Sequence, residues 1–125
     1  MYKVLLADDN ALSRKAVRQS VSWKNNGCKI VGEAENGVKA CQMIRELRPD
    51  IVLMDIRMPV MDGLAATRAI RELPRPDART VPIIAMTANA FADDRQKARD
   101  AGMNEHLAKP IDIGRLHQIL QKFLG

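Results

Sequence analysis

Short apolar runs alternate with segments of helical spacing along the chain, and this alternation constrains the fold more than any other feature. Apolar runs that end in polar or turn residues are typical of strands. The expected strands are residues 3–7, 28–34, 51–54, 81–86 and 105–108. Strands that alternate with helices form a parallel sheet covered on both faces, and such sheets bind ligands beyond the carboxyl ends of their strands. We therefore expect an α/β fold with a doubly wound sheet of five parallel strands.

The segments between these runs carry apolar residues on one face, as amphipathic helices do. Five helices are expected, over 11–23, from Ala40 through Leu47, from Gly63 to a loop at 73–77, over 90–101 and over 112–124. Pro49 ends the second helix, because the residue ahead of a proline avoids the helical region. The 90–101 helix is highly charged and weakly apolar, so we expect it to pack loosely. Two prolines stiffen residues 73–77, which are predicted to be an exposed loop.

The length and composition indicate one domain over residues 1–125, with 46% hydrophobic and 28% charged residues. The sequence contains no apolar run of about 18 residues and no secretion leader, so we expect a cytoplasmic protein without membrane contact. Cys28 and Cys41 lack metal-ligand spacing and are predicted to be small core residues.

A net charge of +5 raises the question of nucleic-acid binding. Arg and Lys are spread over every expected helix, and aromatic residues make up only 3% of the chain. A nucleic-acid surface normally gathers its basic residues in one patch or motif. We therefore expect no nucleic-acid partner, and a basic surface that can steer acidic proteins toward the domain.

Polar residues follow four of the five expected strands. They are Asp8 and Asp9 after the first strand, Asp55 after the third, Thr87 after the fourth and Lys109 after the fifth. If the first and third strands are neighbours, about 4.8 Å apart, three carboxylates converge, which is unfavourable without a cation. Oxygen ligands of this kind suit Mg²⁺, which binds one or two carboxylates together with a phosphate. The sequence therefore predicts a magnesium site, with a lysine and a hydroxyl beside it.

These groups together predict a site for a phosphoryl group. Asp55 would attack phosphorus in line to give an aspartyl phosphate, while Mg²⁺ and Lys109 stabilise the phosphoryl oxygens. Taken one by one, the same residues have ordinary explanations: Asp55 as a loop cap, Thr87 as a strand-end cap, Lys109 as a surface lysine, and Asp8 with Asp9 as helix N-terminal charges. Only the combination at four strand ends favours the chemical interpretation.

The motifs resemble those of receiver domains of two-component response regulators. They are DD at 8–9, MDIRMPVMDG around Asp55, MTA at 86–88 and KP at 109–110, and together they cover essentially the whole chain. The resemblance implies a flavodoxin-like sheet of order 2-1-3-4-5. It also implies that Asp55 is the phosphoacceptor, that Asp9 binds Mg²⁺ directly, that Asp8 binds it through water, and that Arg57 offers its main-chain carbonyl to the metal. Thr87 would be the switch hydroxyl, and Lys109 would bind phosphate and precede a cis peptide bond.

Two longer segments, 83–91 and 101–111, are similar to receivers of hybrid histidine kinases. This implies a histidine kinase or a histidine phosphotransfer domain as partner; the oligomeric state is left open. His106 departs from the family pattern, because many receivers carry Tyr or Phe three residues before the lysine. An imidazole can titrate and hydrogen-bond, so the aromatic part of the switch is expected to differ, unless His106 is an ordinary half-buried residue.

Two other functions compete with this interpretation. A Mg²⁺-dependent phosphohydrolase with an aspartyl nucleophile shares the Asp, Thr, Lys and metal. It needs a second Asp as general acid where this chain has Arg57, which cannot donate a proton at neutral pH. A flavin or nucleotide module is disfavoured by the acidic strand ends and by the lack of a glycine-rich phosphate loop.

Overall fold

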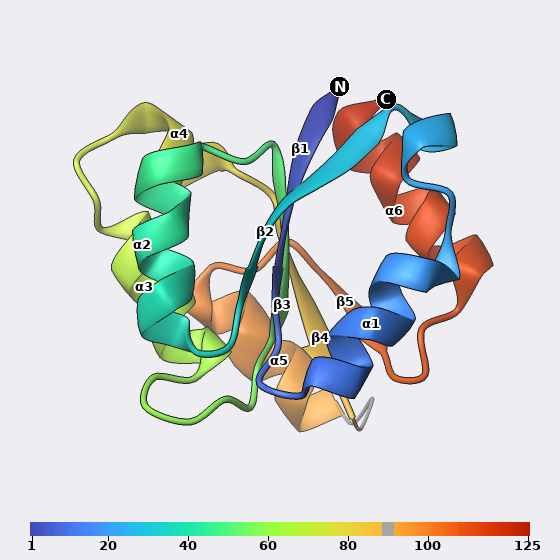
Figure 1. Ribbon diagram of the computed structural model, residues 1–125. Helices are drawn as coiled ribbons and strands as arrows, with labels where there is room; N and C mark the ends of the chain where they lie inside the picture. Colours follow the sequence, from blue (N-terminus) through green and yellow to red (C-terminus); the bar gives the residue numbers. More distant parts are fainter. Residues whose placement is uncertain (89–91) are drawn as a thin grey trace.

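The computed structural model describes residues 1–88 and 92–125 (Figure 1). Its strands are β1 (Tyr2–Ala7), β2 (Cys28–Ala34), β3 (Ile51–Asp55), β4 (Ile83–Thr87) and β5 (Glu105–Ala108). They form one sheet of order β2-β1-β3-β4-β5, and every pairing is parallel. The α/β class, the parallel sheet and the order 2-1-3-4-5 are therefore confirmed.

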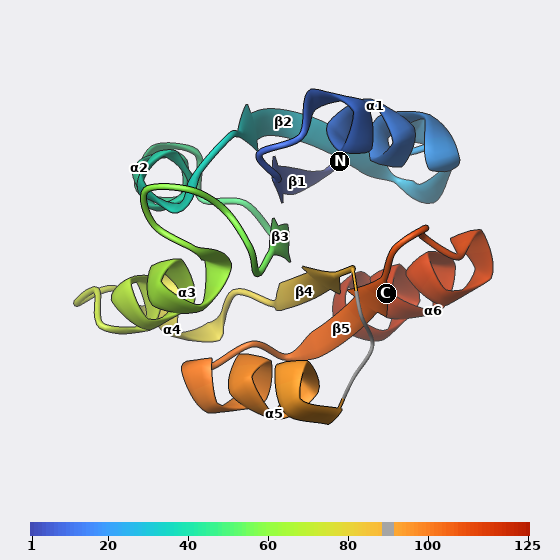
Figure 2. The ribbon, with the colours of Figure 1, turned by 90° about the horizontal axis from the view of Figure 1, so that it is seen from below.

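Helices cover both faces of this sheet. They are α1 (Ala11–Ser20), α2 (Gly37–Leu47), α3 (Gly63–Arg71), α4 (Pro76–Thr80), α5 (Ala92–Ala101) and α6 (Ile113–Leu124), with a short 3₁₀ turn η1 (Lys24–Asn26). Figure 2 shows α1 and α6 on one side of the sheet and α2, α3 and α5 on the other. Within the described ranges, no helix has the length and apolar character needed to cross a membrane.

The sheet separates two hydrophobic cores, and β1 contributes to both. Leu5 and Ala7 point into the core under α2, α3 and α5, whereas Val4 and Leu6 point into the core under α1 and α6. All four side chains are fully buried. Alternate side chains of a strand face opposite sides of a sheet, so a strand covered on both sides must be apolar at every position. This explains the uninterrupted apolar runs of the sequence.

The structure has six helices where five were predicted, because α4 forms in the stretch expected to be a loop. Pro76 occupies the first turn of α4, where a missing N–H costs nothing. Arg75 holds the start of the turn through hydrogen bonds to both carboxylate oxygens of Asp77, at 3.1 and 2.7 Å. Ala78 is fully buried and anchors the turn in the core. The loop prediction for residues 73–77 was therefore wrong for its second half.

The first helix is shorter than predicted and ends at Ser20 instead of Trp23. Val21 is extended, and the chain then turns through η1 into β2. Trp23 is nevertheless in the core under α1 and α6, with 9% of its surface exposed, and its indole N–H donates to the Arg18 carbonyl at 3.0 Å. Its side chain thus packs in the core although α1 has already ended.

Arg71, at the end of α3, ties three later segments together. Its guanidinium donates to the carbonyls of Ala78, Val81 and Gly102 and to the Asn104 side chain, at 2.8 to 3.1 Å. Burial lowers the pKa of Arg71. The side chain therefore connects α3 to the end of α4 and to the turn between α5 and β5.

Candidate functional site

The carboxyl edge of the sheet brings the predicted site residues together. Asp55 is the last residue of β3, Thr87 is the last of β4, and Asp8 and Lys109 directly follow β1 and β5. Oxygen atoms of Asp8, Asp9 and Asp55 all lie within 4.8 Å of one another. Asp8 and Asp55 are buried, whereas Asp9 is exposed. The expected convergence of three carboxylates is therefore present.

The Lys109 ammonium bridges two of these carboxylates. Its Nζ donates to Asp8 Oδ2 at 2.6 Å and to Asp55 Oδ2 at 3.0 Å. Burial lowers the pKa of Lys109, but its hydrogen bonds to the two carboxylates outweigh burial and leave this pKa above its usual value. Lys109 is therefore a fixed cation at the site. The peptide bond between Lys109 and Pro110 is cis, as the resemblance implied.

Asp55 is held in a partly desolvated environment. Burial raises the pKa of Asp55, and the hydrogen bonds from the Arg57 N–H to Oδ1, at 3.1 Å, and from Lys109 to Oδ2 only partly oppose this effect. The nearby Asp8 raises the pKa of Asp55 further. The site thus holds one ammonium and three carboxylates. The carboxylate oxygens fit a hard divalent cation such as Mg²⁺. The role of the Arg57 carbonyl as a metal ligand stays a prediction.

Two glycines fix the loop that follows Asp55. The Gly63 N–H donates to the Ile56 carbonyl at 3.2 Å, and a Cβ on Gly63 would overlap the Asp55 carbonyl oxygen. The Gly37 N–H donates to the Met61 carbonyl at 2.8 Å, and a Cβ there would overlap that oxygen. Sequence reasoning treated Gly63 only as a helix start and missed this contact. Its position directly after Asp62, in a motif shared with the resembling family, was the available signal.

Thr87 is fully buried, and its hydroxyl has no hydrogen-bond partner in the part of the chain that the structure describes. A buried hydroxyl without a partner costs free energy. Such a donor at the end of β4 is free to bond an acceptor that arrives at the neighbouring end of β3. This position agrees with the hydrogen-bond donor that the sequence predicted.

Asp94, on the first turn of α5, is a site residue that sequence reasoning missed. The residue is 6% exposed, and its carboxylate lies 3.5 Å from the Arg57 guanidinium. The sequence assigned α5 to a charged, loosely packed helix, and nothing in its spacing distinguishes Asp94 from the exposed Asp100. Asn89, which the sequence places beside the site, lies outside the described residues.

His106 lies on β5, away from the carboxylates. Its side chain is half-buried, and Nδ1 is 3.4 Å from Glu105 Oε1. Burial lowers the pKa of His106, and the positive charges of Arg95, Arg115 and Arg99 lower it further, although Glu105 opposes them. His106 is not part of the cluster that Asp8, Asp9 and Asp55 form among the described residues, and its part in the switch stays a prediction.

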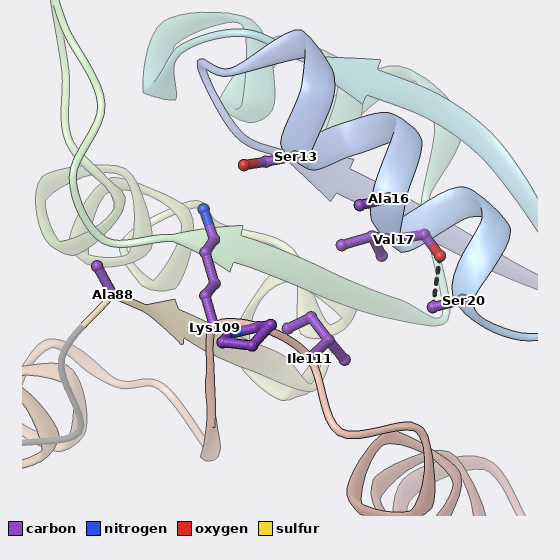
Figure 3. Close-up of a pocket in the computed structure, with 8 residues that line it drawn as sticks. Ser13, Ala16, Val17, Ser20, Ala88, Lys109 and Ile111 are labelled. Carbon is purple, nitrogen blue, oxygen red and sulfur yellow. Dashed lines mark hydrogen bonds between the residues drawn. The ribbon is translucent and has the colours of Figure 1, made fainter.

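A groove of about 470 Å³ opens beside Lys109, between α1 and the segment that follows β5 (Figure 3). Its lining is mostly apolar, with Ala16 and Val17 on one side and Pro110 and Ile111 on the other. Ser13 stands at the same end as the Lys109 side chain (Figure 3). The groove makes the Lys109 end of the sheet reachable from the α1 side.

Residues 4–121 match the family model of the response regulator receiver domain. The chain is 32% identical over 122 residues to the polar-differentiation response regulator DivK of Brucella anthropi, covering 98% of this chain and 95% of DivK. It is 36% identical over 120 residues to the signal transduction histidine-protein kinase BarA of Shigella flexneri, covering 96% of this chain but only 12% of that much longer protein.

Solved structures give the same result. The receiver domain of the sensor histidine kinase PA1611 of Pseudomonas aeruginosa, solved with a magnesium ion coordinated in its active-site cleft, is 38% identical, with a TM-score of 0.85. That match covers 98% of this chain and 96% of the other. The chemotaxis protein CheY4 of Vibrio cholerae is 27% identical, with a TM-score of 0.86 and coverage of 99% of both chains.

Proposed function

Because the chain belongs to the receiver-domain family of two-component response regulators, we propose that it accepts a phosphoryl group on Asp55 from a phosphohistidine. The observation that carries this proposal is the position of Asp55 at the end of β3, with Lys109 3.0 Å from one carboxylate oxygen. The relatives that are histidine kinases favour a histidine kinase or a histidine phosphotransfer domain as partner. The single domain over 1–125 and the cytoplasmic location stay predictions.

In the proposed reaction an Asp55 carboxylate oxygen forms a bond to phosphorus. The bond between phosphorus and the donor imidazole nitrogen breaks, and that nitrogen keeps the electron pair. The Arg57 N–H holds Asp55 Oδ1, and Lys109 holds Oδ2 and supplies positive charge for the phosphoryl oxygens. The resulting aspartyl phosphate then either passes the group to a histidine phosphotransfer domain or changes the surface of the domain.

Mg²⁺, when bound, would neutralise charge on the carboxylates and on the phosphoryl oxygens. We propose Asp8, Asp9, Asp55 and the main chain of Arg57 as the residues that hold it. Two observations support this assignment: the convergence of the three carboxylates within 4.8 Å, and the magnesium ion in the cleft of the receiver domain of PA1611.

A phosphoryl group brings about −1.5 to −2 charges and three acceptor oxygens. The Thr87 hydroxyl, which has no partner among the described residues, would donate to one of these oxygens, and Lys109 to another. The movement of Thr87 toward the phosphoryl group would be passed to β5, because Thr87 pairs with Ala108 in the sheet. We therefore propose β5 and its flanking helices as the surface that reports phosphorylation.

The test is labelling by a small acyl phosphate with Mg²⁺, followed by transfer from labelled phosphohistidine donors. Asp55→Asn should abolish labelling, because it removes the nucleophile. Asp62→Asn is the matched control, since Asp62 lies in the same loop but caps α3, a role that Asn fills equally well. Undiminished labelling of Asp55→Asn would end the proposal, and turnover of a simple phosphate ester would favour the phosphohydrolase instead.

A further inference from the structure

Arg57 contacts the acceptor residue and α5 at the same time. Its main-chain N–H donates to Asp55 Oδ1 at 3.1 Å, and its guanidinium Nη2 lies 3.5 Å from Asp94 Oδ1. The Arg57 side chain is 69% exposed, whereas that of Asp94 is 9% exposed. A long, solvated side chain on a fixed backbone position is free to move, while the buried carboxylate is not.

Residues 94–101 of the helix that carries Asp94 bury few side chains. Among residues 94–101, only Asp94, Ala98 and Ala101 are buried, and both alanines are small. Burial of two methyl groups contributes little free energy. The ion pair with Arg57 therefore adds a link between the first turn of α5 and the loop after β3.

A groove extends from Asp9, past the loop after β3, to Asp94 on α5. It has a volume of about 570 Å³ and is lined by Asp9, by residues 56–59 and by Asp94 and Lys97 of α5. It thus runs from one of the proposed metal ligands to the buried carboxylate. Arg57 itself lines this groove, and its side chain is 69% exposed, so solvent leaves it room to change its rotamer.

We propose that Arg57 exchanges partners when Asp55 is phosphorylated. Its guanidinium leaves Asp94, binds a phosphoryl oxygen, and thereby releases the first turn of α5. This inference rests on the proposed phosphorylation of Asp55. It adds a second trigger, from the β3 side, to the recruitment of Thr87 at the end of β4, and it assigns Asp94 the role of a positioning residue.

The charges favour this exchange. Asp94 offers one negative charge at 3.5 Å to a guanidinium that is mostly solvated, and ion pairs of this kind are weak. A phosphoryl group offers up to two negative charges and several oxygens, which suits the two-pronged geometry of Arg. Once Arg57 has left, the Asp94 carboxylate is buried without that cation, which is unfavourable. Movement of the α5 first turn toward water relieves this cost.

Hydrogen exchange of the α5 amides, with and without a small acyl phosphate and Mg²⁺, tests the exchange. Asp94→Asn and Arg57→Gln each break the ion pair, so α5 should exchange about two- to fivefold faster than wild type before phosphorylation. The further increase on phosphorylation should be smaller in both variants by the same factor. Asp100→Asn is the control, because its exposed carboxylate on the same helix bonds only locally to Gln96, at 2.8 Å, and should behave as wild type.

The rate of phosphoryl loss is a second readout. Asp94→Asn frees the guanidinium for the phosphoryl group and Arg57→Gln removes it, so the two variants should change this rate in opposite directions. Unchanged α5 exchange in a labelled wild-type protein, or rates that move in the same direction, would overturn the inference. Absence of labelling on wild-type Asp55 would instead overturn the proposed function itself.

Discussion

Gly63→Ala gives the most direct test of how the site is built, because the Gly63 backbone packs directly against Asp55. An added Cβ would overlap the Asp55 carbonyl oxygen and would lie 2.9 Å from the Ile56 Cα. Both are backbone atoms, so no side-chain rotation relieves the contact. Ordinary contact begins at 3.4 Å, and the overlap is deepest at the Asp55 carbonyl oxygen, so the end of β3 must move by about 1 Å.

This shift should affect both the free energy of unfolding and the rate of phosphoryl labelling. Overpacking costs about 1–3 kcal/mol, and the better helix propensity of Ala returns up to about 1 kcal/mol, so we expect a net loss of about 1–2 kcal/mol in the free energy of unfolding. A misplacement of 1 Å costs about a hundredfold in rate, so a shift of about this size should slow phosphoryl labelling about a hundredfold.

Gly114→Ala is the matched control, because Gly114 also lies in the first turn of a helix. Its added Cβ would meet only the Asp112 side chain, at 3.2 Å. This variant should be unchanged or stabilised by up to about 1 kcal/mol, and it should be labelled at the wild-type rate. Urea unfolding and labelling time courses of both variants supply the comparison. If Gly63→Ala matches Gly114→Ala in stability and rate, the close packing against Asp55 does not position the acceptor.

Four further predictions concern stability. Arg71→Ala should lower the free energy of unfolding by about 2–4 kcal/mol in urea titrations, because it leaves the carbonyls of Ala78 and Val81 without this partner. Arg68→Ala, on the exposed face of the same helix, is the control and should change the free energy of unfolding by less than about 0.5 kcal/mol. Burial lowers the pKa of His106 below 6.5, so this imidazole binds protons more readily in the unfolded chain than in the folded one. The free energy of unfolding should therefore fall as pH drops below about 6.5, and His106→Phe should make this fall with pH less steep. Burial raises the pKa of Asp55 above 3.8, so the ionised carboxylate destabilises the folded state as pH rises above this value. Without Mg²⁺, Asp55→Asn should therefore melt at a higher temperature than wild type at neutral pH, and the difference in melting temperature should close in acid. Equal melting temperatures of Asp55→Asn and wild type at pH 7 would contradict this reasoning. Mg²⁺ at a hundred times its Kd should raise the free energy of unfolding of wild type by about 2.7 kcal/mol.

Much of the fold could be predicted from the sequence because the sheet is covered on both faces. That burial requires continuous apolar runs such as Val4 to Ala7, which are easy to recognise. The site followed from the same pattern, since parallel strands bring their carboxyl ends to one edge. Asp8, Asp55, Thr87 and Lys109 are therefore found where the strand ends predicted them.

The remaining features depend on contacts between distant residues, which spacing along the chain does not encode. The α4 turn is stabilised by Ala78 in the core and by Arg75 bonded to Asp77, in a stretch whose prolines indicate a loop. The pairing of Arg57 with Asp94 joins residues 37 positions apart. Neither contact has a local signal, so the structure was needed to find them.

The position of Trp23 has a consequence for spectroscopy. It is the single tryptophan of the chain, and it packs beyond the end of α1, near the amino ends of β1 and β2. Because each strand residue advances about 3.3 Å, the length of β1 separates the indole from the carboxylates by roughly 20 Å. Intrinsic fluorescence should therefore follow unfolding of the α1 and α6 core while staying nearly silent to metal or phosphoryl binding. The same emission signal can then measure how ligands shift the folding equilibrium, free of direct quenching at the site.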